Sequence, residues 1–134
     1  MSNEKQIEQE IQAKGLSAPR LTPNHIDSVV QSVHYFTAGD GYAGALASSE
    51  EFNSLPEGER FINPPQQLDL LIFCVIVLKN GFTVTGESAC VSPENFDPEI
   101  GKKIAYENAR NKIWMLEGYL LKEKLYQAEL DKRF

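Results

Sequence analysis

The longest apolar run of the chain lies near its middle and predicts a β-strand. Residues 68–78 are nearly all aliphatic or aromatic, and Lys79-Asn80-Gly81 separates them from a second β-rich stretch, 82–88. Asn-Gly between two such runs is the strongest short signal for a hairpin, because both residues tolerate the positive φ of a type I′ turn. We therefore predict an antiparallel hairpin in which Cys74 pairs with Glu87.

This pairing gives the hairpin two different faces. The first carries odd-numbered residues of the first strand opposite even-numbered residues of the second, is apolar on both strands, and is expected to meet a helix. The second carries even-numbered residues of the first strand opposite two threonines and Glu87. A strand that is apolar on both faces is usually buried on both sides. We therefore expect the segment 38–67 or another subunit to cover the second face; an ordinary solvated strand face is the alternative.

A long helical pattern follows the hairpin and continues to about Lys132. Asp97 is a suitable N-cap, and Pro98 is favoured at the first helical position. Apolar residues recur at helical spacing and mark a stripe that is expected to be buried. The stripe consists of Ile100, Ile104, Trp114, Leu121 and Leu125, widened by Ala105, Ala109, Ile113, Leu116 and Leu120. Because the helix is longer than one small sheet, we expect its C-terminal half to pack on another subunit.

The first 21 residues are predicted to form an N-terminal arm. Ile7 and Ile11 lie one helical turn apart in polar sequence, which indicates a short amphipathic helix over residues 4–14 that ends at Gly15. The apolar stripe of this helix is narrow. The helix is therefore expected either to pack on a partner chain or to lie loosely on the surface.

The pattern weakens between the arm and the hairpin. Thr22-Pro23 predicts the start of a second helix, and residues 34–37 predict a short strand. Residues 38–67 show no clear periodicity and are predicted to form a long variable loop, with one short helix near 43–52. Loops of this length are usually either functional or mobile.

Together these elements predict a single α+β domain over residues 1–134. Its small antiparallel sheet is centred on the hairpin (68–88), is packed with the C-terminal helix (about 98–132) and N-terminal helices, and belongs to an oligomer. A length of 134 residues with 42% hydrophobic content suits one modest core. A net charge of −6 argues against non-specific binding of duplex nucleic acid.

Candidate catalytic groups are sparse. The predicted pairing places Cys74 and Cys90 on opposite faces of the hairpin, so we expect no disulfide between them, and the spacing of His25 and His34 indicates no metal site. We expect no catalytic residues, no cofactor and no metal. The N-terminus lacks the features of a signal peptide, and the apolar run is too short to span a membrane as a helix. We therefore expect a cytoplasmic protein with no membrane partner.

A set of short motifs resembles a family of small tailed-phage and prophage proteins that are usually labelled as conserved phage proteins. The similarity spans residues 16–36 and 68–126, and the motifs that carry it are residues 14–20, 80–90, 93–97 and 100–101, with Ile104-Ala105, Asn108-Ala109 and Lys112-Ile113-Trp114. The resemblance extends to the Thoeris anti-defence proteins, which act as signal sponges. Those proteins bind the cyclic ADP-ribose isomer made by a bacterial TIR-domain defence enzyme and hold it without cleaving it; some relatives also take up cyclic oligonucleotide signals.

The resemblance implies that this chain sequesters a cyclic nucleotide signal in the host cytoplasm, as a homo-oligomer. Such a ligand needs an aromatic platform, amides or hydroxyls for the base edge, and cations for the pyrophosphate. The candidates at or beside motif positions are Phe82 and Phe96 for stacking, Ser88, Asn95 and Asn108 for hydrogen bonds, and Lys103, Arg110 and Lys112 for phosphate. The alternatives are core packing for the two phenylalanines, a backbone hydrogen bond for Asn108, and a solvated position for Arg110.

Two other functions remain open from the sequence. A phage accessory protein could bind a host or phage protein through the hairpin face, and it would be isolated free of nucleotide with a stoichiometric protein partner. A nucleotide-processing enzyme would show turnover with time.

Overall fold

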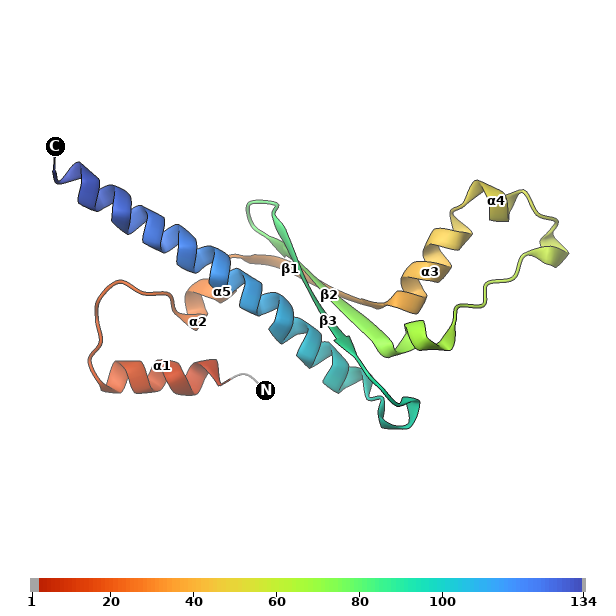
Figure 1. Ribbon diagram of the computed structural model, residues 1–134, viewed down its shortest axis with the longest axis horizontal. Coiled ribbons are helices and arrows are strands. Elements are labelled where there is room, and N and C mark those ends of the chain that lie inside the picture. The colour runs from red at the N-terminus through yellow and green to blue at the C-terminus, as the bar shows by residue number, and fades with distance from the viewer. Residues whose placement is uncertain (1–2, 134) are drawn as a thin grey trace.

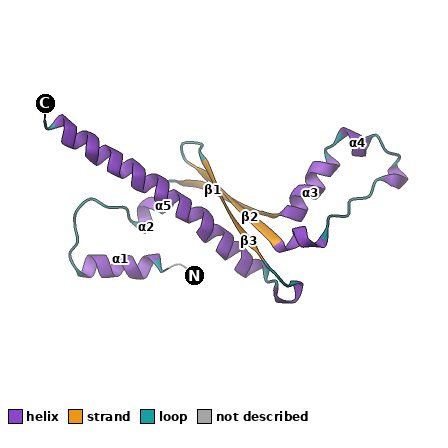
Figure 2. Ribbon diagram, viewed as in Figure 1, coloured by secondary structure: helices purple, strands orange, loops and turns teal. Residues whose placement is uncertain are grey.

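A three-stranded antiparallel sheet and one long helix form the body of the protein. The computed structural model describes residues 3–133. The strands lie in the order β1-β2-β3, and α5 crosses one face of the sheet, where it packs on β2 and β3 (Figures 1 and 2). The helices and strands are, in order, α1 (Glu4–Ala13), α2 (Pro23–Ser28), β1 (Val30–Thr37), α3 (Ala38–Ala47), α4 (Glu50–Asn53), β2 (Leu71–Leu78), β3 (Thr83–Ala89) and α5 (Pro98–Asp131). The predicted α+β class, the hairpin and the long C-terminal helix are confirmed.

The hairpin turn differs from the prediction. The loop has three residues, 79–81. Its last residue, Gly81, has a φ of +90°, and within residues 3–133 only glycines have positive φ. The backbone N–H of Gly81 donates to the carbonyl of Leu78, and the Asn80 side chain accepts from the N–H of Phe82. This is the pattern of a type I turn followed by a left-handed glycine, not of a type I′ turn.

The extra loop residue shifts the register by one, and this shift corrects the predicted faces. Cys74 pairs with Gly86, not with Glu87. The face that meets α5 therefore carries the even-numbered residues of β2, all of which are buried, together with the even-numbered residues of β3. A one-residue slip moves every side chain of a strand to the other face.

The core lies between this face and a narrow strip of small residues on α5. The buried residues of α5 are Gly101, Ala105, Ala109, Arg110 and Ile113. The predicted stripe was partly misplaced: its flanking residues Ala105, Ala109 and Ile113 are buried, whereas its central residues Ile100 and Ile104 remain 55% and 45% exposed. The helix lies so close to β3 that a Cβ added to Gly86 would sit 2.2 Å from the carbonyl oxygen of Ala105.

The segment between β1 and β2 is more ordered than a long loop. Thr37 caps α3, because its hydroxyl accepts from the N–H of Asp40 while the Asp40 carboxylate accepts from the N–H of Thr37. Helices α3 and α4 then lie within 38–67, for which the prediction was a loop with one helix near 43–52. Strand β1 also begins earlier than predicted, at Val30, because β2 offers it a pairing edge over its whole length.

The second face of the sheet, which we call the open face, has no helix layer among residues 3–133. Its residues are Ser32, His34 and Phe36 of β1, Leu71, Phe73, Val75 and Val77 of β2, and Thr83, Thr85, Glu87 and Ala89 of β3. The β2 side chains are half-buried, and the β3 side chains are exposed. The segment 38–67 projects from one end of the sheet instead of covering this face (Figure 1). The prediction placed the odd-numbered residues of β2 against the helix and expected segment 38–67 or another subunit to cover the even-numbered ones. The structure exchanges these two faces, because α5 covers the even-numbered residues. The expectation that segment 38–67 covers them is wrong, and cover of the open face by another subunit is a prediction.

The cysteines behave as single thiols. Cys74 and Cys90 are both free, and burial raises the pKa of the Cys74 thiol. No helix within residues 3–133 is long and apolar enough to cross a membrane.

Candidate functional site

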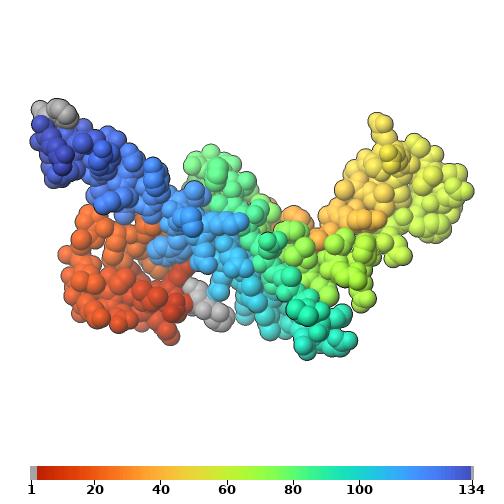
Figure 3. All heavy atoms as spheres, viewed as in Figure 1, coloured from red at the N-terminus to blue at the C-terminus, as the bar shows by residue number. Residues whose placement is uncertain are grey.

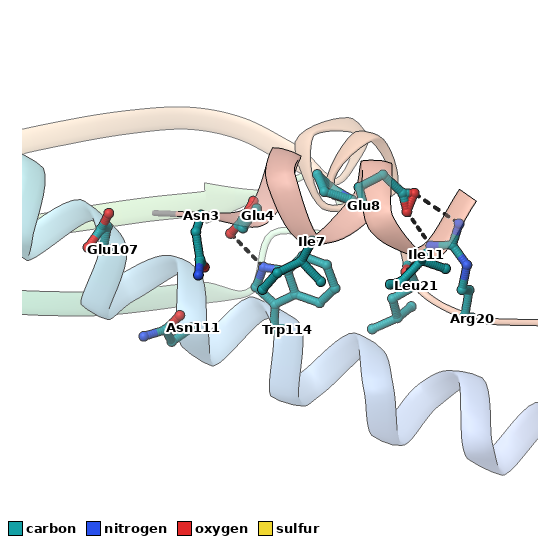
Figure 4. Close-up of a pocket in the computed structure, with 11 residues that line it drawn as sticks. Asn3, Glu4, Ile7, Glu8, Ile11, Arg20, Leu21, Glu107, Asn111 and Trp114 are labelled. Atoms are coloured by element: carbon teal, nitrogen blue, oxygen red, sulfur yellow. Dashed lines mark hydrogen bonds and ion pairs between the residues drawn. The ribbon is translucent and has the colours of Figure 1, made fainter. Parts of the chain in front are cut away.

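The N-terminal arm, residues 3–21 of the described chain, lies beside α5 and leaves a cleft on each side of α1. The arm forms a separate lobe next to the long helix in the space-filling view (Figure 3). The smaller cleft has a volume of about 490 Å³ and includes Ile7, Ile11 and Trp114 (Figure 4). The larger has a volume of about 1190 Å³ and is lined by α1, α2 and α5. Ligand pockets of small molecules span about 300–1,000 Å³.

Arg110 lies where α1, α2 and α5 meet. Its Nε donates to both carboxylate oxygens of Glu4, at 2.8 and 3.0 Å. Its Nη1 lies 2.8 Å from a carboxylate oxygen of Asp27 and 3.1 Å from the Tyr106 hydroxyl, and its Nη2 donates to the carbonyl of Pro23 at 3.3 Å. The guanidinium therefore joins three segments that are far apart in the sequence.

Arg110 is the buried charge of the site, with only 6% of the residue exposed. Burial alone would lower the pKa of its guanidinium, but the hydrogen bonds with Glu4 and Asp27 outweigh burial and raise that pKa above its ordinary value. The alternative of a solvated position for Arg110 is wrong. A buried, oriented guanidinium is suited to bind carboxylate or phosphate.

Trp114 completes the carboxylate site of Arg110. Its indole Nε1 donates to Glu4 at 2.8 Å (Figure 4). Together with Arg110, two side chains one helical turn apart on α5 therefore bind one carboxylate. Within the arm, Arg20 donates to both carboxylate oxygens of Glu8. This hydrogen bonding lowers the pKa of Glu8.

The larger cleft gathers two of the predicted phosphate-binding cations. Lys103 and Arg110 both line it, with the Tyr106 ring between them. The guanidinium carbon of Arg110 lies 6.0 Å from the centre of that ring. The other charged lining residues are Lys5, Glu4, Glu8, Asp27 and Glu107. With four carboxylates against three cations, the lining carries net negative charge while Glu4 is bound.

The remaining predicted site residues lie elsewhere and do not form one site within the single chain. Phe96 packs against the core, which confirms the alternative of core packing for this residue. Asn108 donates to the backbone carbonyl of Glu87 at 2.8 Å, which confirms the alternative of a backbone hydrogen bond. Ser88 is half-buried near the start of α5. Three further residues of the predicted set are exposed and lie outside the larger cleft: Phe82, Asn95 and Lys112.

Tyr106, Trp114 and Glu4 were missed as site residues from the sequence. Tyr106 and Trp114 lie four positions before and after the predicted Arg110 on α5, and this spacing is a signal that could have placed them on the same face. Glu4 gives no comparable signal, because it lies 106 positions from Arg110. Within residues 3–133, no three His, Cys, Asp or Glu side chains come together as metal ligands.

Comparison with known families gives one match. The model of the phage protein (N4 Gp49/phage Sf6 gene 66) family matches residues 21–125. No curated protein and no solved structure matches the chain. The matched range contains the sheet, most of α5 and the Arg110 site, whereas α1 lies outside it.

Proposed function

The chain belongs to the N4 Gp49/phage Sf6 gene 66 family of phage proteins, and from that premise we propose that it antagonises host immunity by sequestration. In this proposal the protein binds a cyclic nucleotide signal, such as a cyclic ADP-ribose isomer or a cyclic oligonucleotide, without cleaving it. The effector of a Thoeris-type defence is then never activated. The protein acts in the host cytoplasm, as a homo-oligomer.

The observation that carries the proposal is the larger cleft. It combines an aromatic ring, a buried guanidinium and a lysine along one face of α5, at Tyr106, Arg110 and Lys103. These groups supply stacking and charge-assisted hydrogen bonds, which are the contacts that an adenine nucleotide with a pyrophosphate requires. Its volume of about 1190 Å³ exceeds that of most small-molecule pockets and leaves room for a dinucleotide.

The experiment that tests the proposal separates sequestration from cleavage. Purified protein is incubated with a cyclic ADP-ribose isomer, freed of unbound nucleotide, and heat-denatured. We expect the isomer to be released intact in a stoichiometric amount. Recovery of a cleaved product would support the nucleotide-processing alternative, and absence of bound nucleotide would contradict the proposal.

A pair of variants locates the binding site. Lys103→Ala removes a cation from the cleft, whereas Lys124→Ala removes an equally exposed lysine near the C-terminal end of α5. We expect Lys103→Ala to weaken binding of the isomer roughly three- to tenfold in Kd, measured by calorimetry, because one contact to phosphate is lost. Lys124→Ala should leave the Kd unchanged. Equal effects of the two substitutions would place the ligand elsewhere.

The proposed homo-oligomer is supported by the surface that the single chain leaves accessible. The chain exposes 9767 Å², whereas a compact monomer of 15.0 kDa is expected to expose about 7,000 Å². The difference of about 2,700 Å² is more than the roughly 800 Å² that each partner buries in an interface of standard size. The open face and the C-terminal half of α5, where Met115 and Tyr119 are 75% and 73% exposed, supply much of this surface.

The open face also favours the second candidate function. A half-apolar sheet face with the exposed ring of Phe36 beside Phe73 could bind a host or phage protein instead of a second copy. Co-purification of a stoichiometric protein partner, together with absence of nucleotide, would support this alternative.

A further inference from the structure

We propose that the N-terminal arm is a latch on the nucleotide cleft: the Glu4 carboxylate occupies an anion site built by Arg110 and Trp114, and a phosphate group of an entering ligand displaces it. This inference rests on the proposed function, since it assumes that the cleft receives an anionic ligand. It adds a competition between the arm and the ligand for the same donors.

The anion site keeps its shape without Glu4. The Nη atoms of Arg110 are held by Asp27 and Tyr106, and by the carbonyl of Pro23. Its Nε and the indole Nε1 of Trp114 are the donors that point at Glu4. When Glu4 leaves, the guanidinium is still oriented, so its Nε and the indole N–H meet a phosphate oxygen with little loss of conformational freedom.

The arm itself is weakly held. None of the residues of α1 is buried, and Ile7 remains 47% exposed at its contact with the smaller cleft. The hydrogen bonding between Arg20 and Glu8 joins two parts of the arm and does not attach the arm to α5. The carboxylate of Glu4, which accepts from Arg110 and Trp114, is a polar attachment of α1 to α5. Elements with few buried contacts open at a lower free energy than the core.

The range matched by the family model agrees with the proposal that Glu4 is a latch on the anion site. The range matched by the phage family model, residues 21–125, contains Arg110 and Trp114, whereas Glu4 lies outside it. The donors of the anion site thus lie within the matched range, and the carboxylate that they bind lies outside it.

Electrostatics makes arm and ligand exclusive. With Glu4 in place, the lining of the larger cleft has four carboxylates and three cations, so a pyrophosphate meets net repulsion. Departure of the arm takes Glu4, Glu8 and Lys5 with it, which leaves two carboxylates against two cations and frees the Nε of Arg110. Ligand affinity and arm attachment are therefore reciprocally coupled.

The test uses the full-length protein and Trp114, which is the single tryptophan of the chain. Glu4→Gln removes the charge of the latch while keeping its shape. The matched control is Glu10→Gln, which changes an exposed glutamate on the same helix whose partner is Lys14. Inorganic pyrophosphate is the probe, and the readouts are Trp114 emission and tryptic cleavage after Arg20. Circular dichroism checks that each variant keeps the folded core.

We expect pyrophosphate to shift Trp114 emission to the red and to accelerate cleavage after Arg20 in the wild type. Glu4→Gln should show both changes without pyrophosphate and should bind pyrophosphate about tenfold more tightly. Glu10→Gln should match the wild type. Unchanged emission in Glu4→Gln, or equal affinity of Glu4→Gln and the wild type, would overturn the latch.

Failure of the latch and failure of the proposed function give different results. If a cyclic ADP-ribose isomer binds the wild type and Glu4→Gln equally while Arg20 stays protected, sequestration stands and the latch is wrong. If pyrophosphate releases the arm but the isomer does not bind, the latch stands and the sequestered ligand is a different phosphate compound.

Discussion

Gly86 sets the distance between β3 and α5. A Cβ at this position would lie 2.2 Å from the carbonyl oxygen of Ala105 and 2.3 Å from the amide nitrogen of Ala109. Both are backbone atoms of the middle of a long helix, so no side chain can rotate away to make room. The small residues of the buried strip on α5 and the missing side chain of Gly86 together allow the helix to lie directly on the sheet.

Replacement of this glycine should therefore be costly. We expect Gly86→Ala to lower the free energy of unfolding by about 3 kcal/mol, the upper part of the range for overpacked cores, measured by urea denaturation. Gly44→Ala is the control, because a Cβ at Gly44 meets nothing within 4 Å. Gly44 lies inside α3, so its replacement should stabilise that helix by up to about 1 kcal/mol. Equal effects of the two substitutions would contradict the close contact.

The hairpin is the element that decides which face of the sheet meets α5. Its three-residue loop requires a left-handed residue at its last position, and Gly81 has φ of +90° there. The Asn80 side chain supports the same turn by accepting from the N–H of Phe82. A loop shorter by one residue would turn the polar residues of β3 toward the core.

A substitution at the turn tests this requirement. We expect Gly81→Ala to lower the free energy of unfolding by about 1–2 kcal/mol, because a side chain is strained at positive φ. Gly58→Ala, at an open position without positive φ, should change it by less than about 0.5 kcal/mol. Chemical denaturation followed by circular dichroism measures both values. A tolerated Gly81→Ala would indicate that the loop adopts a different turn.

At the scale of the whole molecule, the sheet has one helix layer and projecting ends. Helices α3 and α4 extend from one end, and the arm and the C-terminal half of α5 extend from the other (Figure 1). Within one copy these projections enclose little volume, which is why the accessible surface is large for the mass. The same geometry leaves the open face accessible, where a second copy of the chain could bury it.

A charge on the open face should prevent this association. Val75 lies on the central strand, between His34 and Thr85. We expect wild-type protein to sediment as a multiple of 15.0 kDa and Val75→Glu to sediment as a monomer. The control is Val91→Glu, which makes the same change at a loop residue that is 98% exposed and should keep the assembly intact. A monomeric wild type, or an assembled Val75→Glu with a native thermal transition, would exclude association through this face.

The sequence predicted those parts of the fold whose signals are local. Asp97-Pro98 marked the start of α5, and Thr22 and Gly15 marked the limits of the two N-terminal helices, because a cap depends on neighbouring residues. The face assignment failed because Asn80-Gly81 fits both a two-residue and a three-residue loop. The start of α3 was predicted too late, near residue 43, because the glycines of this helix obscured the capping box of Thr37.

The candidate site was less accessible to prediction, since its geometry depends on distant parts of the chain. Lys103 and Arg110 were expected to meet phosphate, and both line one cleft. Arg110 is buried beside the carboxylates of Glu4 and of Asp27 in α2, with which it forms ion pairs. No short sequence motif connects either residue to Arg110. Phe82 was assigned to the same site, yet it lies beside the hairpin turn and is 56% exposed.

The span between Glu4 and its partners also has a consequence for synthesis of the protein. The two contacts join residues 106 and 110 positions apart, so they cannot form until the first half of α5 has left the ribosome. Until then α1 is a ten-residue helix without a surface to pack on, and such helices are marginal in water. Each nascent chain therefore passes through a stage in which the arm has been translated but the α5 residues that bind Glu4 have not.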